Sequence, residues 1–155
     1  MPLPSRAAVA LLATLAFPAP NRTPPVTHRA TGTFDVTLTP QSTDDAEGTP
    51  LGRLALDKRF RGGLEATSTG TMLSAGTPVK GSAGYVAIER VTGSLHGKTG
   101  TFALQHSATM TRGVGALTIV VVPDSGTGEL TGLSGSLSIE ITGGKHAYVF
   151  EYALD

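Results

Sequence analysis

Apolar and polar residues alternate along most of the chain after Thr31, and this period of two is typical of β-strands that bury one face. The first such segment runs from Thr31 to Pro40, where Phe34 and Asp35 fall on opposite faces. No stretch of this region has apolar residues at the spacing of three and four that an amphipathic helix needs. The pattern therefore predicts an all-β protein with no helix of more than two turns after residue 31.

Seven further strands are expected, because alternating segments are separated by glycine, proline and small polar residues. They cover Arg53–Phe60, Leu64–Leu73, two long strands within Gly81–Met110 joined around Gly93–Gly100, Leu117–Val122, Ser136–Thr142 and His146–Leu154. The polar segment Gln41–Gly52 is expected to be a long loop that could act as a lid. Eight strands in series predict an antiparallel, closed barrel of lipocalin-like architecture, wide enough inside for side chains or one small ligand.

The first thirty residues differ from the rest of the chain. Arg6 precedes an apolar run from Ala7 to Phe17, and prolines then punctuate a polar stretch. This pattern is typical of a secretory signal followed by a linker, or of a disordered extension, so cytoplasmic and secreted locations both stay open. The apolar run is too short to span a bilayer. We expect residues 1–30 to be an extension and residues 31–155 to form a single barrel domain.

Composition excludes several classes of function. Lys and Arg together number 12, as do Asp and Glu, and the basic residues form no cluster, so a nucleic-acid partner is not expected. The chain has no cysteine, and its four histidines lack metal-ligand spacing, which argues against a metal site. Gly113-Val114-Gly115 lacks the strand-to-helix context of a dinucleotide site, so no cofactor is expected.

The most informative polar residue of the central hairpin is Glu89. Alternation places it on one face of its strand with Tyr85, Ala87 and Val91. A carboxylate among small apolar neighbours suits a lined cavity, where burial would raise its pKa and allow general acid or base catalysis. The alternative is that Glu89 pairs with Arg90, Lys80 or Lys58 at the surface or the rim.

The neighbouring strand adds Gln105 and His106, which lie on opposite faces, so only one of them can point inward. Glu89, Gln105 and His106 are the candidate catalytic residues. For His106 the alternative is a core histidine bonded to the backbone, because it shares its face with Phe102, Leu104 and Met110. Four other polar residues, from three of the strands, are candidates for ligand binding: Tyr85, Ser68, Glu151 and Tyr148.

Three segments carry a resemblance to a known family. They are GSAGYVAIERVTGSLHGKTGTFALQH (81–106), VVPDSGTGELTGLSG (121–135) and GKHAYVFEYAL (144–154). The chain from about Gly32 to Leu154 resembles an uncharacterised bacterial family of unknown function whose members are similar to the allene oxide cyclase barrels. The resemblance implies an eight-stranded antiparallel barrel with a central cavity. Allene oxide cyclases isomerise a bound fatty-acid epoxide without a cofactor, but none of their active-site residues can be matched to a position in this chain.

Three functions follow from these expectations. The first is a cofactor-independent isomerase or cyclase that folds a hydrophobic small molecule inside the barrel, since positioning alone can lower the barrier of an intramolecular reaction. The second is a binding or carrier protein that uses the same cavity without chemistry. The third is a structural module with a solidly packed interior. A homo-oligomer is compatible with each of them.

Overall fold

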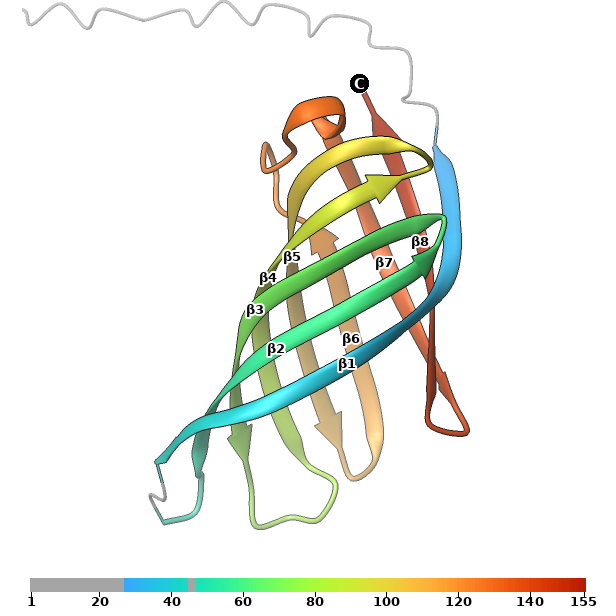
Figure 1. The fold of residues 1–155 in the computed structure, drawn as a ribbon. Helices are drawn as coiled ribbons and strands as arrows, with labels where there is room; N and C mark the ends of the chain where they lie inside the picture. The colour runs from blue at the N-terminus through green and yellow to red at the C-terminus, as the bar shows by residue number, and fades with distance from the viewer. Residues whose placement is uncertain (1–26, 45–46) are drawn as a thin grey trace, which may run out of the picture.

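The computed structural model describes residues 27–44 and 47–155, so most of the predicted N-terminal extension lies outside the described residues. Eight strands pair in sequence order, each antiparallel to the next, and β8 pairs with β1 to close a barrel (Figure 1). The strands are β1 (His28–Asp44), β2 (Leu51–Gly62), β3 (Leu64–Gly76), β4 (Ala83–Leu95), β5 (Lys98–Thr111), β6 (Val114–Val121), β7 (Leu133–Thr142) and β8 (Lys145–Leu154). The predicted fold class is therefore confirmed.

The only helix in the described part of the chain is η1 (Gly128–Leu130), a single 3-10 turn within the glycine-rich connection between β6 and β7. No described helix has the length and apolar character needed to cross a membrane. Leu130 of η1 is 1% exposed and belongs to the hydrophobic core. The short helix therefore covers one end of the barrel.

β1 is longer than its sequence pattern indicates. It begins at His28 and continues past Pro40 to Asp44, while β2 already begins at Leu51, so the predicted loop Gln41–Gly52 is wrong. Of the described residues between the two strands, only 47–50 lie outside them. Two features accommodate Pro40. The pairing register with β2 shifts between Pro40 and Ser42, and the pairing of β1 with β8 ends at Phe34. Proline is tolerated in a strand that has a free edge.

The connections alternate between the two ends of the barrel because each strand reverses direction. At one end lie the β2–β3 and β4–β5 turns, η1 and the C-terminus; we call this the closed end (Figure 1). At the other lie the β1–β2, β3–β4, β5–β6 and β7–β8 connections; we call this the open end. Inward-facing aromatic and aliphatic side chains fill the closed half, including Leu64, Leu95, Phe102, Leu130 and Phe150, each at most 2% exposed.

The wall of the barrel has one weak joint. β6 and β7 share a single residue pair, Val120 with Ser136, and the two strands diverge from there toward the open end (Figure 1). By contrast, β3 and β4 pair continuously from Leu64 with Leu95 to Gly76 with Ala83. The interior is consequently packed solid at the closed end and less tightly enclosed at the open end.

Candidate functional site

A buried ionic cluster lies in the middle of the barrel, around Glu89 of β4. The Glu89 side chain is fully buried, and three strands supply donors to its carboxylate. Lys58 Nζ of β2 and His106 Nε2 of β5 each lie 2.7 Å from Oε1. Ser68 Oγ of β3 donates to Oε2 at 2.5 Å. The structure therefore brings together three residues singled out in the sequence, Glu89, His106 and Ser68, and adds Lys58.

Strand register explains how these side chains meet. Ser68 is paired with Lys58 across β2 and β3, and Gly70, two residues further along β3, is paired with Glu89. A Cβ atom at Gly70 would lie 2.7 Å from Glu89 Cα, so the missing side chain allows β3 and β4 to approach closely beside the cluster. The period of two then directs every member of the cluster to the interior.

The electrostatics of Glu89 differ from the expectation for an isolated buried carboxylate. Burial acts to raise its pKa, but the His106 hydrogen bond, the charge and hydrogen bond of Lys58 and the Ser68 hydrogen bond outweigh it, and the pKa is lowered from 4.5 to about 2. The expectation of a raised pKa is thus wrong, because it took no account of donors from other strands. Lys58 is the ionic partner of Glu89, as one alternative anticipated, but the pair lies inside the barrel and not at its rim.

His106 is held by the carboxylate and still reaches the cavity. For Nε2 to donate to Glu89 it must carry a proton, so the neutral imidazole keeps an acceptor lone pair on Nδ1. Within the described part of the chain, the ring of His106 makes one hydrogen bond, from Nε2 to Glu89. Because no fully buried side-chain nitrogen there lacks a partner, Nδ1 is not fully buried. His106 also lines a cavity. The arrangement leaves one ring nitrogen to exchange a proton with a bound molecule.

That cavity, the inner cavity, has a volume of about 270 Å³ and receives side chains from all eight strands. Its lining is mostly apolar and consists of Phe34, Val36, Leu38, Leu56, Lys58, Met72, Tyr85, His106, Leu117, Ile139, Ile141 and His146. A second space of about 490 Å³, the mouth cavity, shares four of these residues and extends to the open end, where Ala83 and Met110 line it. Together they form an apolar funnel with Lys58 and His106 in its wall.

Tyr85 lines both the inner and the mouth cavity. Burial, followed by the charge of Glu89, raises the pKa of its hydroxyl above 10.0, so the group is protonated at neutral pH and can donate a hydrogen bond to a ligand. Lys58 also packs against two aromatic rings, with Nζ 5.1 Å from the ring centre of Phe34 and 5.7 Å from that of Phe60. The hydrogen-bond donors of Tyr85 and Lys58 therefore line a mainly apolar cavity.

Three of the residues predicted for the site lie elsewhere. Gln105 is exposed on the outer face of β5, since His106 takes the inward position. Glu151 is exposed on the outer face of β8. Tyr148 is buried, but its hydroxyl accepts from Leu64 N at 2.9 Å and donates to Arg61 O at 3.2 Å, so it anchors β8 to the β2–β3 turn. The structure does not bring these three side chains to the Glu89 cluster.

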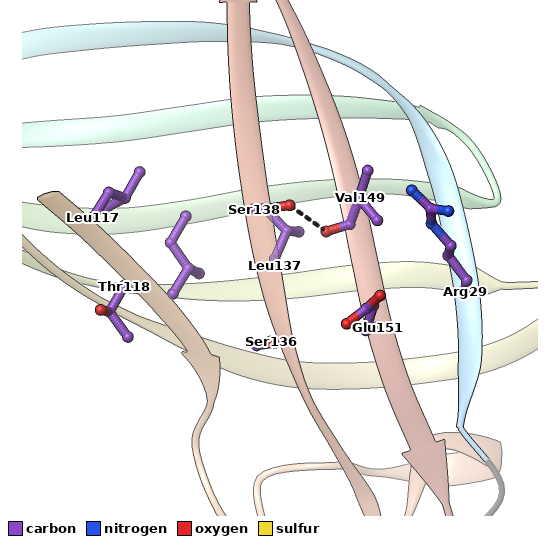
Figure 2. Close-up of a pocket in the computed structure, with 9 residues that line it drawn as sticks. Arg29, Leu117, Thr118, Ser136, Leu137, Ser138, Val149 and Glu151 are labelled. Atoms are coloured by element: carbon purple, nitrogen blue, oxygen red, sulfur yellow. Dashed lines mark hydrogen bonds between the residues drawn. The ribbon is translucent and has the colours of Figure 1, made fainter. Parts of the chain in front are cut away.

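Glu151 instead lines a slot of about 380 Å³ on the outer wall, at the joint between β6 and β7. Figure 2 shows Leu117 and Thr118 of β6 across from Ser136–Ser138 of β7, with Glu151 of β8 and Arg29 of β1 beside them. The slot holds no buried ionisable side chain, and its only dashed contact joins Ser138 Oγ to Val149 O. The inner cavity is the better candidate site, because it combines an apolar lining with convergent buried polar groups.

Sequence reasoning considered Lys58 only as a pairing partner at the rim and missed Phe34 and His146 as cavity residues. Lys58 could have been recognised from the sequence, since it lies two residues from both Leu56 and Phe60 and therefore shares the inward face of its strand with them. The position of His146 in the cavity could not be recognised from the sequence. It reaches Phe34, with ring centres 4.9 Å apart, only because β8 closes onto β1.

Comparison with known proteins gives a family and no activity. The model of the family described as "Protein of unknown function (DUF3224)" matches residues 30–152. A crystal structure of a DUF3224-family protein of unknown function from Shewanella oneidensis MR-1 is 52% identical in sequence and has a TM-score of 0.80, with 84% of this chain and 99% of that chain covered. No curated protein matches the chain. The chain therefore belongs to the DUF3224 family, and a solved structure from that family is similar to it in fold.

Proposed function

We propose that the protein binds a hydrophobic small molecule in the inner cavity and acts on it as a cofactor-independent isomerase or cyclase. The observation that carries the proposal is that His106 is bonded to the buried Glu89 through Nε2 and also lines the inner cavity. An imidazole oriented by a carboxylate is a frequent arrangement for general acid–base catalysis. Proton transfer of this kind typically accelerates a reaction by about 10²- to 10⁴-fold.

The proposed chemistry needs no external reactant. His106 Nδ1 takes a proton from a carbon next to a carbonyl or epoxide of the bound molecule. The C–H electron pair forms a carbon–carbon double bond, while the π bond of the carbonyl, or one C–O bond of the epoxide, breaks and leaves its electron pair on the oxygen. Lys58, whose ammonium uses one N–H on Glu89, and the Tyr85 hydroxyl would stabilise the negative charge on that oxygen. The imidazolium then returns the proton to a different atom, so that atoms and charge balance in an isomerisation.

The sequence resemblance to the allene oxide cyclase barrels, if it extends to function, would favour the same class of reaction, because those enzymes also isomerise a hydrophobic substrate without a cofactor. Shape alone contributes to such a reaction, since a substrate folded by the cavity wall has less freedom to lose on the way to the transition state. No residue role is transferred from those enzymes. The proposal depends on Glu89, His106 and Lys58 of this chain.

A second function, a carrier without chemistry, is favoured by one specific observation. Lys58, Ser68 and His106 each donate a hydrogen bond to the Glu89 carboxylate, and the pKa of Glu89 is low. The cluster can therefore serve to hold four strands together. A carrier would bind the same apolar molecules in the same funnel. The two functions differ in whether His106 exchanges a proton with the ligand.

The test uses 2-tetralone, an apolar bicyclic ketone with exchangeable protons next to its carbonyl. Full-length protein in D₂O is expected to bind it and to accelerate deuterium incorporation, measured by mass spectrometry. His106→Gln keeps an N–H donor for Glu89 but has no basic nitrogen, so it should lower the exchange rate at least about 100-fold with binding retained. Ala108→Phe, which fills the mouth cavity, should abolish binding, whereas Gln105→Phe on the outer face of the same strand should not.

Binding without accelerated exchange in the wild-type protein would identify the carrier and contradict the isomerase. Equal exchange by wild type and His106→Gln would remove His106 from the mechanism. Binding that survives Ala108→Phe would place the ligand outside the funnel, and both functions would then lose their site.

A further inference from the structure

The inner cavity has polar residues on two separate parts of its wall. Eight of its twelve lining residues are apolar, and the other four are Lys58, Tyr85, His106 and His146. Lys58 and His106 are bonded to Glu89, and Tyr85 lies on the same face of β4 as Glu89. Among the described residues that line the cavity, His146 is the one polar residue outside this cluster.

Strand pairing brings His146 to the cavity from β8. It is the second residue of that strand and alternates with Tyr148, Phe150 and Tyr152, which are all buried. It is paired with Phe34 of β1, and the centres of the two rings lie 4.9 Å apart. The pairing of β1 with β8 ends at these two residues. The imidazole is therefore half-buried, at the edge of the cavity.

Apolar side chains separate His146 from the Glu89 cluster in both directions around the barrel. β6 and β7 lie between β8 and β5 in one direction, and β1 lies between β8 and β2 in the other. The cavity residues that these three strands contribute are all apolar: Leu117, Ile139, Ile141, Phe34, Val36 and Leu38. His146 is consequently a second polar point of the cavity, set apart from the first.

His146 also reaches the outside of the barrel. It lines a groove of about 360 Å³ whose other residues include the exposed Thr33, Asp35 and Lys145. Within the described part of the chain the imidazole has a ring contact with Phe34 and no hydrogen bond, so water can serve its nitrogens. A molecule that fills the inner cavity removes water from the side of the ring that faces it. Binding is then weaker unless the molecule itself supplies a hydrogen-bonding group there.

We propose that the ligand carries a hydroxyl group at the end opposite its carbonyl, and that His146 forms a hydrogen bond with this hydroxyl. A neutral imidazole offers one donor and one acceptor nitrogen, and a hydroxyl group can pair with either. The substrate class is then an apolar molecule with a carbonyl at the Glu89 cluster and a hydroxyl at His146. The inference rests on the proposed function, which places the carbonyl at the cluster, and adds a substrate class to it.

The test compares two derivatives of 2-tetralone, with binding to the full-length protein measured by isothermal titration calorimetry. 6-Hydroxy-2-tetralone carries its hydroxyl at the far end of the two rings from the carbonyl, and 6-methyl-2-tetralone has a similar shape without a polar group there. The wild type should bind the hydroxy compound at least about tenfold more tightly. His146→Phe keeps a ring against Phe34 but has no ring nitrogen, so the preference should fall below about twofold.

His28→Phe is the matched control. His28 is a histidine of β1 whose ring centre lies 5.3 Å from that of Tyr152, and it does not line the inner cavity. This variant should keep the tenfold preference of the wild type. A second measurement needs no substitution: in ¹⁵N-labelled wild type, the ring nitrogen resonances of His146 should shift more with the hydroxy compound than with the methyl compound.

Equal affinity of the wild type for the two compounds would overturn the inference and leave the proposed function standing, because ketone exchange does not need the hydroxyl. A preference that survives in His146→Phe would also overturn it, as would an equal loss in His28→Phe. If His146→Phe fails to fold, the wild-type resonances decide, and equal shifts with both compounds would contradict the inference. If neither compound binds to the wild type, the proposed function fails together with it.

Discussion

Replacement of Glu89 by Gln is expected to destabilise the barrel by about 3–5 kcal/mol at neutral pH. The substitution keeps the shape of the side chain but leaves the Lys58 ammonium, whose side chain is 5% exposed, without a negative partner 2.7 Å away. A buried charge that loses its partner cannot recover its hydration, and the folded state then carries that cost. Urea denaturation of the two proteins at pH 7 measures the difference.

Two further variants assign the cause of this loss. Glu151→Gln removes an exposed carboxylate from the outer face of β8 and should change stability by less than about 0.5 kcal/mol. Combining Lys58→Met with Glu89→Gln removes both charges and keeps the volume, so the double variant should recover at least half of the loss. A Glu89→Gln protein as stable as the wild type would show that the ion pair contributes nothing, and the description of the cluster would be wrong.

The same carboxylate is expected to make the protein sensitive to acid. The pKa of Glu89 is about 2 in the folded protein and near its ordinary value of 4.5 in the unfolded chain. A lowered pKa contributes stability that is complete above the unfolded value and is lost as the pH falls through the folded value. The contribution is about 3 kcal/mol, since each unit corresponds to about 1.4 kcal/mol. The loss should fall between about pH 4.5 and 2.

Glu89→Gln serves as the control for this window, because other carboxylates titrate in the same range. The free energy of unfolding of the wild type should approach that of the variant as the pH is lowered, and the gap should shrink by about 3 kcal/mol. A gap that stays constant from neutral pH to about pH 2 would show that Glu89 has the same pKa in both states.

The fold could be predicted from the sequence because apolar and polar residues alternate with a period of two in most of its strands. Alternation identified the strands, glycines marked the turns, and the inward face of β4 with Glu89 could be chosen from its apolar neighbours. Pro40 predicted the end of a strand, because proline ends a strand in most contexts, whereas a shifted register and a free edge allow β1 to continue here. Rules that use only the local sequence take no account of how the neighbouring strand is paired.

The site was harder to predict because it depends on contacts between strands far apart in the chain. The direction of the Glu89 pKa reverses once Lys58, His106 and Ser68 are in place, and their approach is decided by register, which the sequence does not state. The outward position of Gln105 followed from the choice of His106 as the inward residue, and alternation alone could not make that choice. Tyr148 was predicted to bind a ligand, but its hydroxyl is bonded to backbone groups of Leu64 and Arg61.

The proposed chemistry requires that Glu89 hold His106 with Nε2 protonated and Nδ1 open to the cavity, and the imidazole nitrogens can report on this directly. Long-range ¹H–¹⁵N spectra of ¹⁵N-labelled protein should be recorded at about pH 9, well above the ordinary imidazole pKa of about 6.5. We predict the Nε2–H tautomer for His106 in the wild type, and a shift of the Nδ1 resonance when 2-tetralone is added. An Nδ1–H tautomer, or an Nδ1 resonance that does not shift when the ketone is added, would show that His106 is not the base that acts on the ligand.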